Sequence, residues 1–176
     1  MIKGEIKLNN EFQMIKANEL TDNVFSIIGK DWMLITSGSV DNYNTMTASW
    51  GGMGHLWNKN VCFIFVRPSR YTYEFMEKND NFSLSFFNEE WRNALTICGK
   101  KSGRDIDKAK ETGLIPIPGN NQTTGFDQAR LIIECKKLYY QDIIPEQFLD
   151  PTIEKNYNGS DYHRMYVGEI LSIMKK

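Results

Sequence analysis

The stretch TMTASWGGMGHLW, residues 45–57, places small hydroxyl residues, two tryptophans and three glycines close together. Threonine, alanine and serine leave room for a flat ligand to lie against the backbone, and they offer hydrogen bonds to it. The same residues also fit a β-strand that runs into a glycine-rich turn. In that strand Thr45, Thr47 and Ser49 would share one face, and Met46, Ala48 and Trp50 the other. On these residues alone the strand is favoured and the ligand platform stays open.

The segments around this stretch predict a sheet. Residues 32–39 (WMLITSGS) fit a strand, residues 40–44 (VDNYN) a polar turn, and residues 45–50 the returning strand of a hairpin. Apolar or alternating runs predict four more strands, at residues 61–67, 81–87, 129–143 and 163–174. The run at 61–67 is apolar on both pleat faces, so we expect it to be buried on both sides. The run at 81–87 alternates, with Phe82, Leu84 and Phe86 facing inward.

Three helices are expected between these strands, at residues 69–79, 88–99 and 102–113. Each has a capping signal at its start. The capping residues are Ser69 or Thr72 for the first helix, Asn88 for the second, and Ser102 with Asp105 for the third. A glycine ends the second and the third helix. The two prolines of IPIPGNNQ, residues 115–122, predict an extended loop.

The order of these elements predicts a fold that is mainly β with helical inserts. About six strands alternate with helices too irregularly for a doubly wound sheet, and the glycines of residues 51–54 do not form the GxGxxG turn of a dinucleotide site. A predominantly antiparallel barrel with inserted helices fits best.

The whole chain predicts one domain, residues 1–176. A chain of this length buries roughly 70% of its unfolded surface, which is enough for a core without disulfides. Cys62, Cys98 and Cys135 include no close pair, which is typical of reduced thiols in a cytosol. The N-terminal segment MIKGEIKLNNEF is charged where a signal peptide is apolar, and no apolar run approaches the roughly 20 residues that span a bilayer. We therefore expect a cytoplasmic protein.

The charge balance argues against two classes of partner. The net charge is −1, with 21 basic and 22 acidic residues, so no global field would attract nucleic acid or an anionic membrane. An anion would have to bind to a local basic cluster. The aromatic content of 12% is consistent with a packed interior, an aromatic-lined pocket or a subunit interface, and composition does not choose among them.

Two local clusters have the composition of an anion site. RPSRYTYE, residues 67–74, gathers two arginines and hydroxyl residues where a buried strand meets a helix start. CGKKSGRDIDK, residues 98–108, adds a glycine turn with four basic residues. The alternative for the first cluster is an ordinary capped helix with exposed arginines. The alternative for the second is a solvated face neutralised by Asp105, Asp107 and Glu111.

A third candidate functional segment is DYHRMYVGE, residues 161–169, which places His163 at the start of the last strand. His55 and His163 are the two histidines, and a lone histidine is most often an ordinary surface residue. Metal binding is not expected, because no histidine, cysteine or carboxylate pair has ligand spacing. Nucleophilic catalysis is not expected either, because Cys98 has no evident histidine partner and no GxSxG elbow occurs.

Together, TMTASW, VRPSRYTYE, CGKKSGRDIDK and DYHRMYVGE occur in an order that resembles the flavin reductase-like FMN-binding split-barrel family, in particular its flavoredoxin-like branch. The resemblance runs from about Trp32 to Gly168. It implies a six-stranded antiparallel Greek-key split β-barrel, a homodimer, and FMN bound near the subunit interface.

The resemblance also implies a role for each motif. TMTASW and the asparagine before it would meet the isoalloxazine ring, the next two motifs the ribityl phosphate, and the last motif would approach the ring. Carried over in this way, the expected ring residues are Asn44, Thr47, Ala48, Ser49, Trp50 and His163. The expected phosphate and ribityl residues are Arg67, Ser69, Arg70, Tyr71, Thr72, Ser102, Gly103, Asp105 and Lys108. Chemistry would occur on the flavin, with no catalytic side chain required and His163 as a possible auxiliary.

These expectations lead to two hypotheses of function. In the first, the protein is an NAD(P)H-dependent flavin reductase in which NADH or NADPH binds transiently and reduces FMN. In the second, it is a flavoredoxin-like electron carrier that docks a redox partner protein, with Trp57 or Trp91 as candidates for the docking patch. The alternative for both tryptophans, which is favoured, is a place in the core or the dimer interface. A flavin-binding or storage module is the third option.

Overall fold

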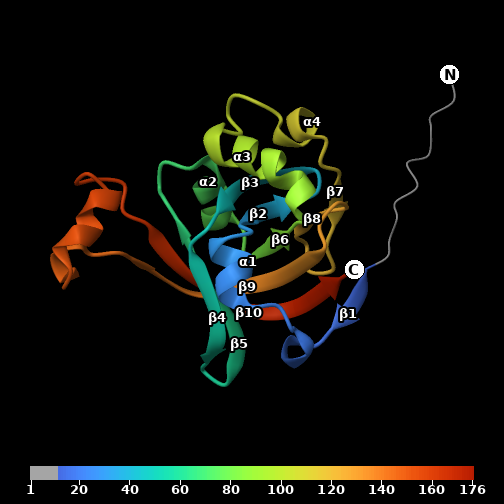
Figure 1. Ribbon diagram of the computed structural model, residues 1–176, viewed down its shortest axis with the longest axis horizontal. Helices are drawn as coiled ribbons and strands as arrows, with labels where there is room; N and C mark the ends of the chain where they lie inside the picture. The colour runs from blue at the N-terminus through green and yellow to red at the C-terminus, as the bar shows by residue number, and fades with distance from the viewer. Residues whose placement is uncertain (1–11) are drawn as a thin grey trace, which may run out of the picture.

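The computed structural model describes residues 12–176 (Figure 1). The charged N-terminal segment that argues against a signal peptide lies outside these residues, apart from Phe12. The strands are β1 (Gln13–Ile15), β2 (Met33–Ser39), β3 (Asn42–Ala48), β4 (Gly51–Leu56), β5 (Lys59–Val66), β6 (Asn81–Phe86), β7 (Pro116–Pro118), β8 (Thr124–Phe126), β9 (Leu131–Asp142) and β10 (Arg164–Lys175). The helices are α1 (Val24–Gly29), α2 (Tyr71–Lys78), α3 (Arg92–Lys100) and α4 (Lys108–Thr112), with short 3-10 turns η1 (Ala17–Glu19), η2 (Glu89–Trp91), η3 (Pro145–Gln147) and η4 (Pro151–Asn156).

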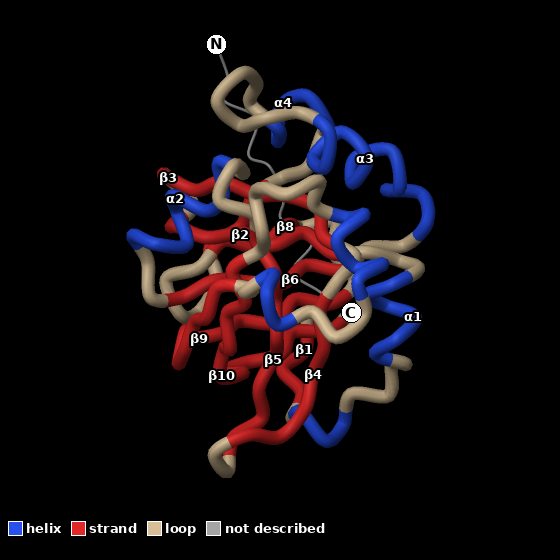
Figure 2. The backbone as a smooth tube through the Cα atoms, turned by 90° about the vertical axis from the view of Figure 1, so that its left-hand side faces the viewer, coloured by secondary structure: helices blue, strands red, loops and turns tan. Residues whose placement is uncertain are grey.

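One antiparallel sheet dominates the molecule. Its strand order is β3-β2-β6-β9-β10-β5-β4, and β1 adds to β10 beyond this path. A separate two-stranded ribbon pairs β7 with β8. Figure 2 shows α3 and α4 together at one end of the strands, with α1 and α2 on opposite sides. The mainly β, antiparallel class with helical inserts is therefore confirmed, although the described residues contain more strands than the six expected.

The glycine-rich segment 51–56 is a strand, so its prediction as a turn is wrong. It pairs with β5 along its whole length as β4. The turn comes afterwards, at Trp57 and Asn58, whose φ angles of +53° and +57° suit a tight two-residue hairpin. Glycine is required at Gly51, because an added Cβ would lie 2.7 Å from the Phe63 carbonyl oxygen. The close approach of β5 explains the glycine there.

Two apolar clusters form the core. The larger one fills the barrel and includes Phe82, Leu84 and Phe86, as their alternation predicts. The smaller one lies beneath α3 and includes Leu95 and Phe126. Because this second cluster covers the outer face of β6, the serines between the inward residues of that strand are buried as well. The three cysteines are free and buried.

The helix boundaries differ from the expected ones in three places. The residue that precedes α2 as its cap is Arg70, not Ser69 or Thr72. The segment 88–99 divides into η2 and α3, and the Asn88 side chain makes no capping hydrogen bond. The helix expected at 102–113 is only α4, capped by Asp107. Ser102 instead closes a local turn, because its hydroxyl accepts from the Arg104 amide at 3.2 Å.

Two further segments complete the comparison. The expected loop at 115–122 contains β7, which pairs with β8 despite its two prolines because it is an edge strand of a two-stranded ribbon. The long connection between β9 and β10, residues 143–163, projects from the left of the body in Figure 1 and carries η3 and η4. Within residues 12–176, no helix has both the length and the apolar character needed to cross a bilayer.

Candidate functional site

The site is a cleft along the free edge of β3, between the start of α2 and the end of α3. Two hollows make up this cleft, and Met46 and Arg70 line both. The first, the edge hollow, has a volume of about 230 Å³ and is lined by Met46, Thr47, Ala48, Ser49, Trp50, Phe65, Arg67, Arg70, Gly99 and His163. The second, the basic hollow, has a volume of about 190 Å³ and is lined by Met46, Ser69, Arg70, Tyr71, Thr72, Lys100, Lys101, Ser102, Gly103, Arg104 and Lys108.

The β3 backbone presents hydrogen-bonding groups to the cleft. β3 is the end strand of the sheet, so alternate residues have peptide groups with no strand partner. The Thr45 carbonyl oxygen faces this free edge, where it accepts from Lys108 Nζ at 2.7 Å. The N–H and C=O groups of successive residues point to opposite sides of a strand, so those of Thr47 face the free edge, as those of Thr45 do. The Thr47 hydroxyl is bonded to the Leu95 carbonyl of α3, which fixes the strand against the helix.

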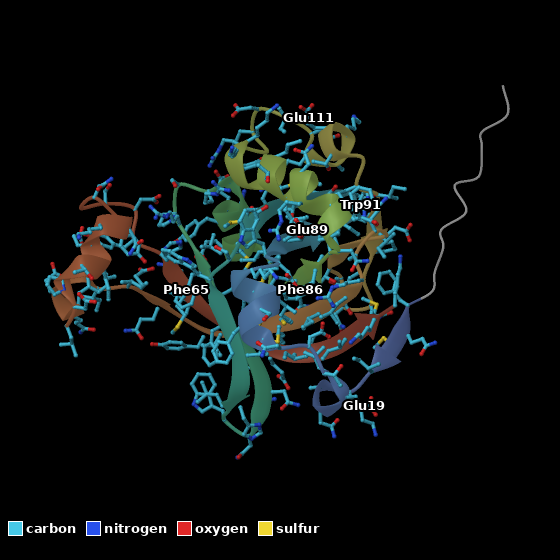
Figure 3. The ribbon with its side chains drawn as sticks, viewed as in Figure 1. Glu19, Phe65, Phe86, Glu89, Trp91 and Glu111 are labelled. Atoms are coloured by element: carbon cyan, nitrogen blue, oxygen red, sulfur yellow. The ribbon has the colours of Figure 1, made fainter. Side chains whose placement is uncertain are left out.

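An aromatic group closes the far end of the edge hollow. Trp50 is 44% exposed, and its ring centroid lies 5.1 Å from that of His163. His163 is 8% exposed, and its Nδ1 lies 3.0 Å from the Tyr157 hydroxyl. Burial, with a smaller contribution from Arg67, lowers the pKa of His163 to about 4. The imidazole is therefore neutral at neutral pH. Phe65 lies on the side of β5 that faces the 143–163 connection (Figure 3).

The basic hollow has the donors of an anion site, and among residues 12–176 no carboxylate lines it. Arg70 Nη2 donates to the Gly99 carbonyl at 2.6 Å, and Lys108 Nζ donates to the carbonyls of Thr45 and Cys98. In the part of the chain that the structure describes, both cations are paired with backbone oxygens only. Burial lowers the pKa of Arg70, and it lowers the pKa of Lys108 to about 8. A bound anion would relieve this cost of holding charge away from water.

The other cations of this region are partly neutralised, as the alternative interpretation of the 98–108 cluster expects. Lys101 pairs with Glu111 at 2.9 Å, and Arg104 pairs with Glu74. Asp107, the cap of α4, pairs with Lys110 three residues further along the chain. All of these pairs are largely exposed. None of them includes the half-buried Arg70 or the buried Lys108, which have no carboxylate partner among residues 12–176.

The 143–163 connection is bound to two residues expected to contact phosphate. Asp161 accepts from the Ser69 amide at 3.0 Å and from the Ser69 hydroxyl at 2.6 Å. Arg67 donates to the Asn156 carbonyl at 2.7 Å, and its guanidinium carbon lies 5.1 Å from the Tyr157 ring centroid. These contacts fix the connection beside the cleft. As a result, the amide and hydroxyl of Ser69 and part of the Arg67 guanidinium already have hydrogen-bond partners inside the protein.

All of the predicted site residues except Asn44 and Asp105 line one of the two hollows. Asn44 is buried behind them. Its side-chain amide contacts the Thr72 hydroxyl at 2.7 Å, and an added Cβ on Gly103 would clash with the same amide group. Asp105 is exposed and, together with Asn44, lines a wider groove of about 900 Å³ that shares Tyr71, Gly103 and Lys108 with the basic hollow.

The sequence did not indicate several residues that line the cleft or contact its lining. Phe65 belongs to a strand that its apolar pattern places only in the core. Its position directly before Val66 and Arg67 was the available signal, since alternation places Phe65 and Arg67 on the same face. Tyr157 and Asp161 lie in a connection without periodicity, so no pattern could place them near Ser69. Within residues 12–176 no group of three or more histidine, cysteine, aspartate or glutamate side chains is arranged to hold a metal ion.

The chemistry of the cleft suits a ligand with a flat ring and an anionic tail. Apolar and aromatic side chains and a free strand edge line one hollow. Basic side chains line the other, among them the half-buried Arg70 and the buried Lys108. An FMN molecule combines such a ring with a phosphate that is close to dianionic at neutral pH. The observed donor set therefore fits FMN, with the ring along β3 and the phosphate among the cations.

Comparisons with known proteins are consistent with this geometry. Residues 25–174 match the family model described as flavin reductase like domain. An FMN-binding protein from Thermus thermophilus, solved with bound p-hydroxybenzaldehyde, is 17% identical over 93% of this chain and 82% of its own, with a TM-score of 0.65. Flavoredoxin from Methanosarcina acetivorans is 22% identical over 93% of this chain and 76% of its own, also with a TM-score of 0.65.

An NADH:FAD oxidoreductase from Streptomyces globisporus is 14% identical over 83% of this chain and 75% of its own, with a TM-score of 0.62. No curated protein sequence matches the chain. At these identities the structural likeness shows a shared fold, which confirms the split-barrel class predicted from the sequence.

Proposed function

This chain belongs to the flavin reductase-like family, and from that premise we propose that it is an FMN-binding oxidoreductase reduced by NADH or NADPH. The observation that supports this most strongly is the pairing of the two hollows. A cavity whose described lining contains five cations and no carboxylate opens beside an aromatic-lined strand edge, and Arg70 lines both.

In this proposal the protein binds FMN through its own residues in three ways. Arg70 and Lys108 hold the phosphate, and each charge-assisted hydrogen bond contributes about 1.5–3 kcal/mol. Thr47 offers its peptide groups to the edge of the ring. Trp50 and His163 close the ring end of the cleft and exclude water there. The remaining predicted residues that line the hollows complete the walls.

FMN, when bound, supplies hydride and electron transfer. The protein residues then have two tasks, to orient the ring and to set the charge around it. The neutral His163 is one such residue, because its Nδ1 is engaged by Tyr157 and its charge does not change near neutral pH. The reduction of the ring by a nicotinamide nucleotide is suggested by the Streptomyces neighbour, whose name includes NADH.

The test starts from purified protein. Its visible spectrum, and the mass of whatever is released on heating, identify the flavin. The loaded protein is then mixed anaerobically with NADH or with NADPH, and the flavin absorbance is followed. We expect bleaching with at least one nucleotide. A protein that takes up FMN but bleaches with neither nucleotide would contradict the reductase activity and leave flavin binding intact.

The electron-carrier alternative is supported by one surface feature. Trp57 is 55% exposed at the β4–β5 tip, and its ring lies 6.1 Å from that of the exposed Tyr139. An aromatic patch of this kind suits a redox partner protein. Trp91 does not belong to the patch, because it packs beside the cluster under α3, on another side of the molecule (Figure 3). Reduction by a partner protein but not by nicotinamide nucleotides would select this alternative.

The proposal includes a homodimer with FMN near the subunit interface. Its support is exposed apolar surface, since Leu149 in the 143–163 connection is fully exposed and Trp57 more than half exposed. Light scattering on the purified protein measures the mass directly. If the second subunit completes the site, dilution to monomers releases FMN. Retention of FMN by a monomer would show that the second subunit is not needed.

A further inference from the structure

A turn in the 143–163 connection, residues 157–160, contains the dipeptide Asn158–Gly159. Asn158 is the only asparagine of the chain that is followed by glycine. Both residues are exposed, and both have left-handed backbone angles, with φ of +51° at Asn158 and +78° at Gly159. An asparagine in an exposed turn can react with its own backbone when the next amide nitrogen is unshielded. Glycine leaves that nitrogen unshielded, because it has no side chain.

A carboxylate lies at the nitrogen that would react. Glu154 Oε1 accepts from the Gly159 backbone amide at 2.7 Å. This separation is within the reach of a general base. The Tyr162 hydroxyl donates to the same oxygen at 2.8 Å, so it holds the carboxylate in place. The turn therefore combines an exposed carboxamide, an unshielded nitrogen and a group that can accept the proton of that nitrogen.

We propose that Asn158 and Gly159 form a self-modification site, at which the asparagine is converted to aspartate and isoaspartate. The Gly159 nitrogen attacks the side-chain carbonyl carbon of Asn158. Glu154 accepts the amide proton and gives it to the leaving group, which departs as ammonia. The new bond closes a succinimide ring, and water then opens this ring at either of its two carbonyls. The net reaction consumes one water and releases one ammonia, and no electrons are transferred.

The products change the turn in two ways. A carboxylate at position 158 lies near Glu154, and like charges repel. In the isoaspartate product the main chain runs through the former side chain, so it is one methylene longer. Asp161 also has a left-handed φ, of +55°, so the turn is tightly wound on both sides of Ser160. A longer chain does not fit this geometry.

Two contacts that hold the connection beside the cleft flank the turn. Before it, the buried Tyr157 contacts His163, and after it, Asp161 bonds to Ser69. A longer and more negative turn weakens these contacts, so the connection should separate from the body more often as the protein ages. Only the protein and water take part, so the reaction occurs with or without FMN. It can therefore fail or succeed independently of the proposed function.

The first test follows the reaction in the full chain. Purified protein is incubated at neutral and mildly alkaline pH, then denatured and digested with trypsin, which releases the peptide of residues 156–164. We expect this peptide to gain about one dalton with time and to become a substrate for a methyltransferase specific for isoaspartate. Asn58 is the internal control, because it is exposed with φ of +57° but is followed by Lys59. Asn158 should react at least ten-fold faster, and equal rates would overturn the proposal.

Variants then separate the roles of the residues. Asn158→Gln cannot close the same ring and should stay unmodified. Glu154→Gln keeps an oxygen that can accept from Gly159 but cannot take its proton, so it should slow the reaction about five-fold. Glu146→Gln is the matched control, because Glu146 is an exposed glutamate of the same connection, and it should react as wild type. An equal or faster reaction in Glu154→Gln would overturn the assignment of Glu154 as the base.

The last measurement tests the structural consequence. Fresh and aged samples of the native protein are treated with trypsin, and cleavage after Lys155 in η4 is followed. Aged wild-type protein should be cleaved at least two-fold faster than fresh protein, whereas Asn158→Gln should not change with age. Equal rates for fresh and fully modified wild-type protein would show that this turn does not control the connection.

Discussion

Arg67 and Arg70 have the same charge but different partners, and this predicts different effects of their removal. Within residues 12–176 Arg70 bonds only to the backbone carbonyl of Gly99, whereas Arg67 is bound to Asn156 and Tyr157 of the 143–163 connection. Arg70→Ala should weaken FMN binding by about 1.5–3 kcal/mol and leave riboflavin binding unchanged, since riboflavin lacks the phosphate.

Calorimetric titration with both ligands measures this difference. Arg104→Ala is the matched control, because Arg104 is exposed and paired with Glu74, and its effect on FMN should be smaller. The assignment of Arg70 to the phosphate would be contradicted by equal losses for FMN and riboflavin.

Lys108 predicts how FMN binding depends on pH. Burial lowers the pKa of Lys108 from 10.5 to about 8. In the ligand-free protein the amine therefore loses its proton as the pH rises through about 8, and the basic hollow loses a positive charge. The Kd for FMN should rise above this pH, and the Kd for riboflavin should not. Lys108→Arg stays charged and should remove the dependence. A riboflavin curve with the same slope would mean that another group titrates.

At the scale of elements, the stability of β4 should depend on Gly51 much more than on Gly52. A Cβ on Gly51 would lie 2.7 Å from the Phe63 carbonyl, whereas a Cβ on Gly52 would make an ordinary contact of 3.7 Å with the Phe63 ring. Gly51→Ala should therefore lower the free energy of unfolding by about 1–3 kcal/mol. Gly52→Ala, the control, should change it little. Urea unfolding measures both, and equal effects would contradict the close approach of the two strands.

The 143–163 connection gives a second prediction at this scale. Asp161→Asn removes the charge that bonds to Ser69, so the connection should separate from the body more often. Trypsin should then cleave faster after Lys155, which lies in η4. Asp150→Asn is the control, since Asp150 bonds only to the nearby Thr152. Ser69→Ala should reproduce the effect of Asp161→Asn, and unchanged cleavage in both would show that this contact does not hold the connection.

The elements that sequence patterns predicted are those with a strong local signal. The apolar run that forms β5 and the alternating run that forms β6 depend on side chains alone. β4 was missed because its glycines have no side chains that show a pattern, and only the neighbouring β5 determines its path. The helix at 102–113 was predicted too long, because a capping pattern at Ser102 also fits an isolated turn.

For the whole molecule, the sequence predicted most of the residues that line the cleft, but not the contacts that hold the 143–163 connection beside it. Thr47, Arg70 and Lys108 belong to three motifs that are far apart in the sequence. Local patterns could not show that they meet, and only the family resemblance predicted it. The contacts of Asp161 with Ser69 and of Tyr157 with His163 involve a connection without periodicity.

The most direct measurement of the central claim is a crystal structure of the protein soaked in excess FMN. The claim predicts density for the phosphate in the basic hollow, within hydrogen-bond distance of Arg70 or Lys108, and the ring along the free edge of β3. A phosphate found elsewhere, or a basic hollow filled by the protein's own side chains in the presence of FMN, would contradict it.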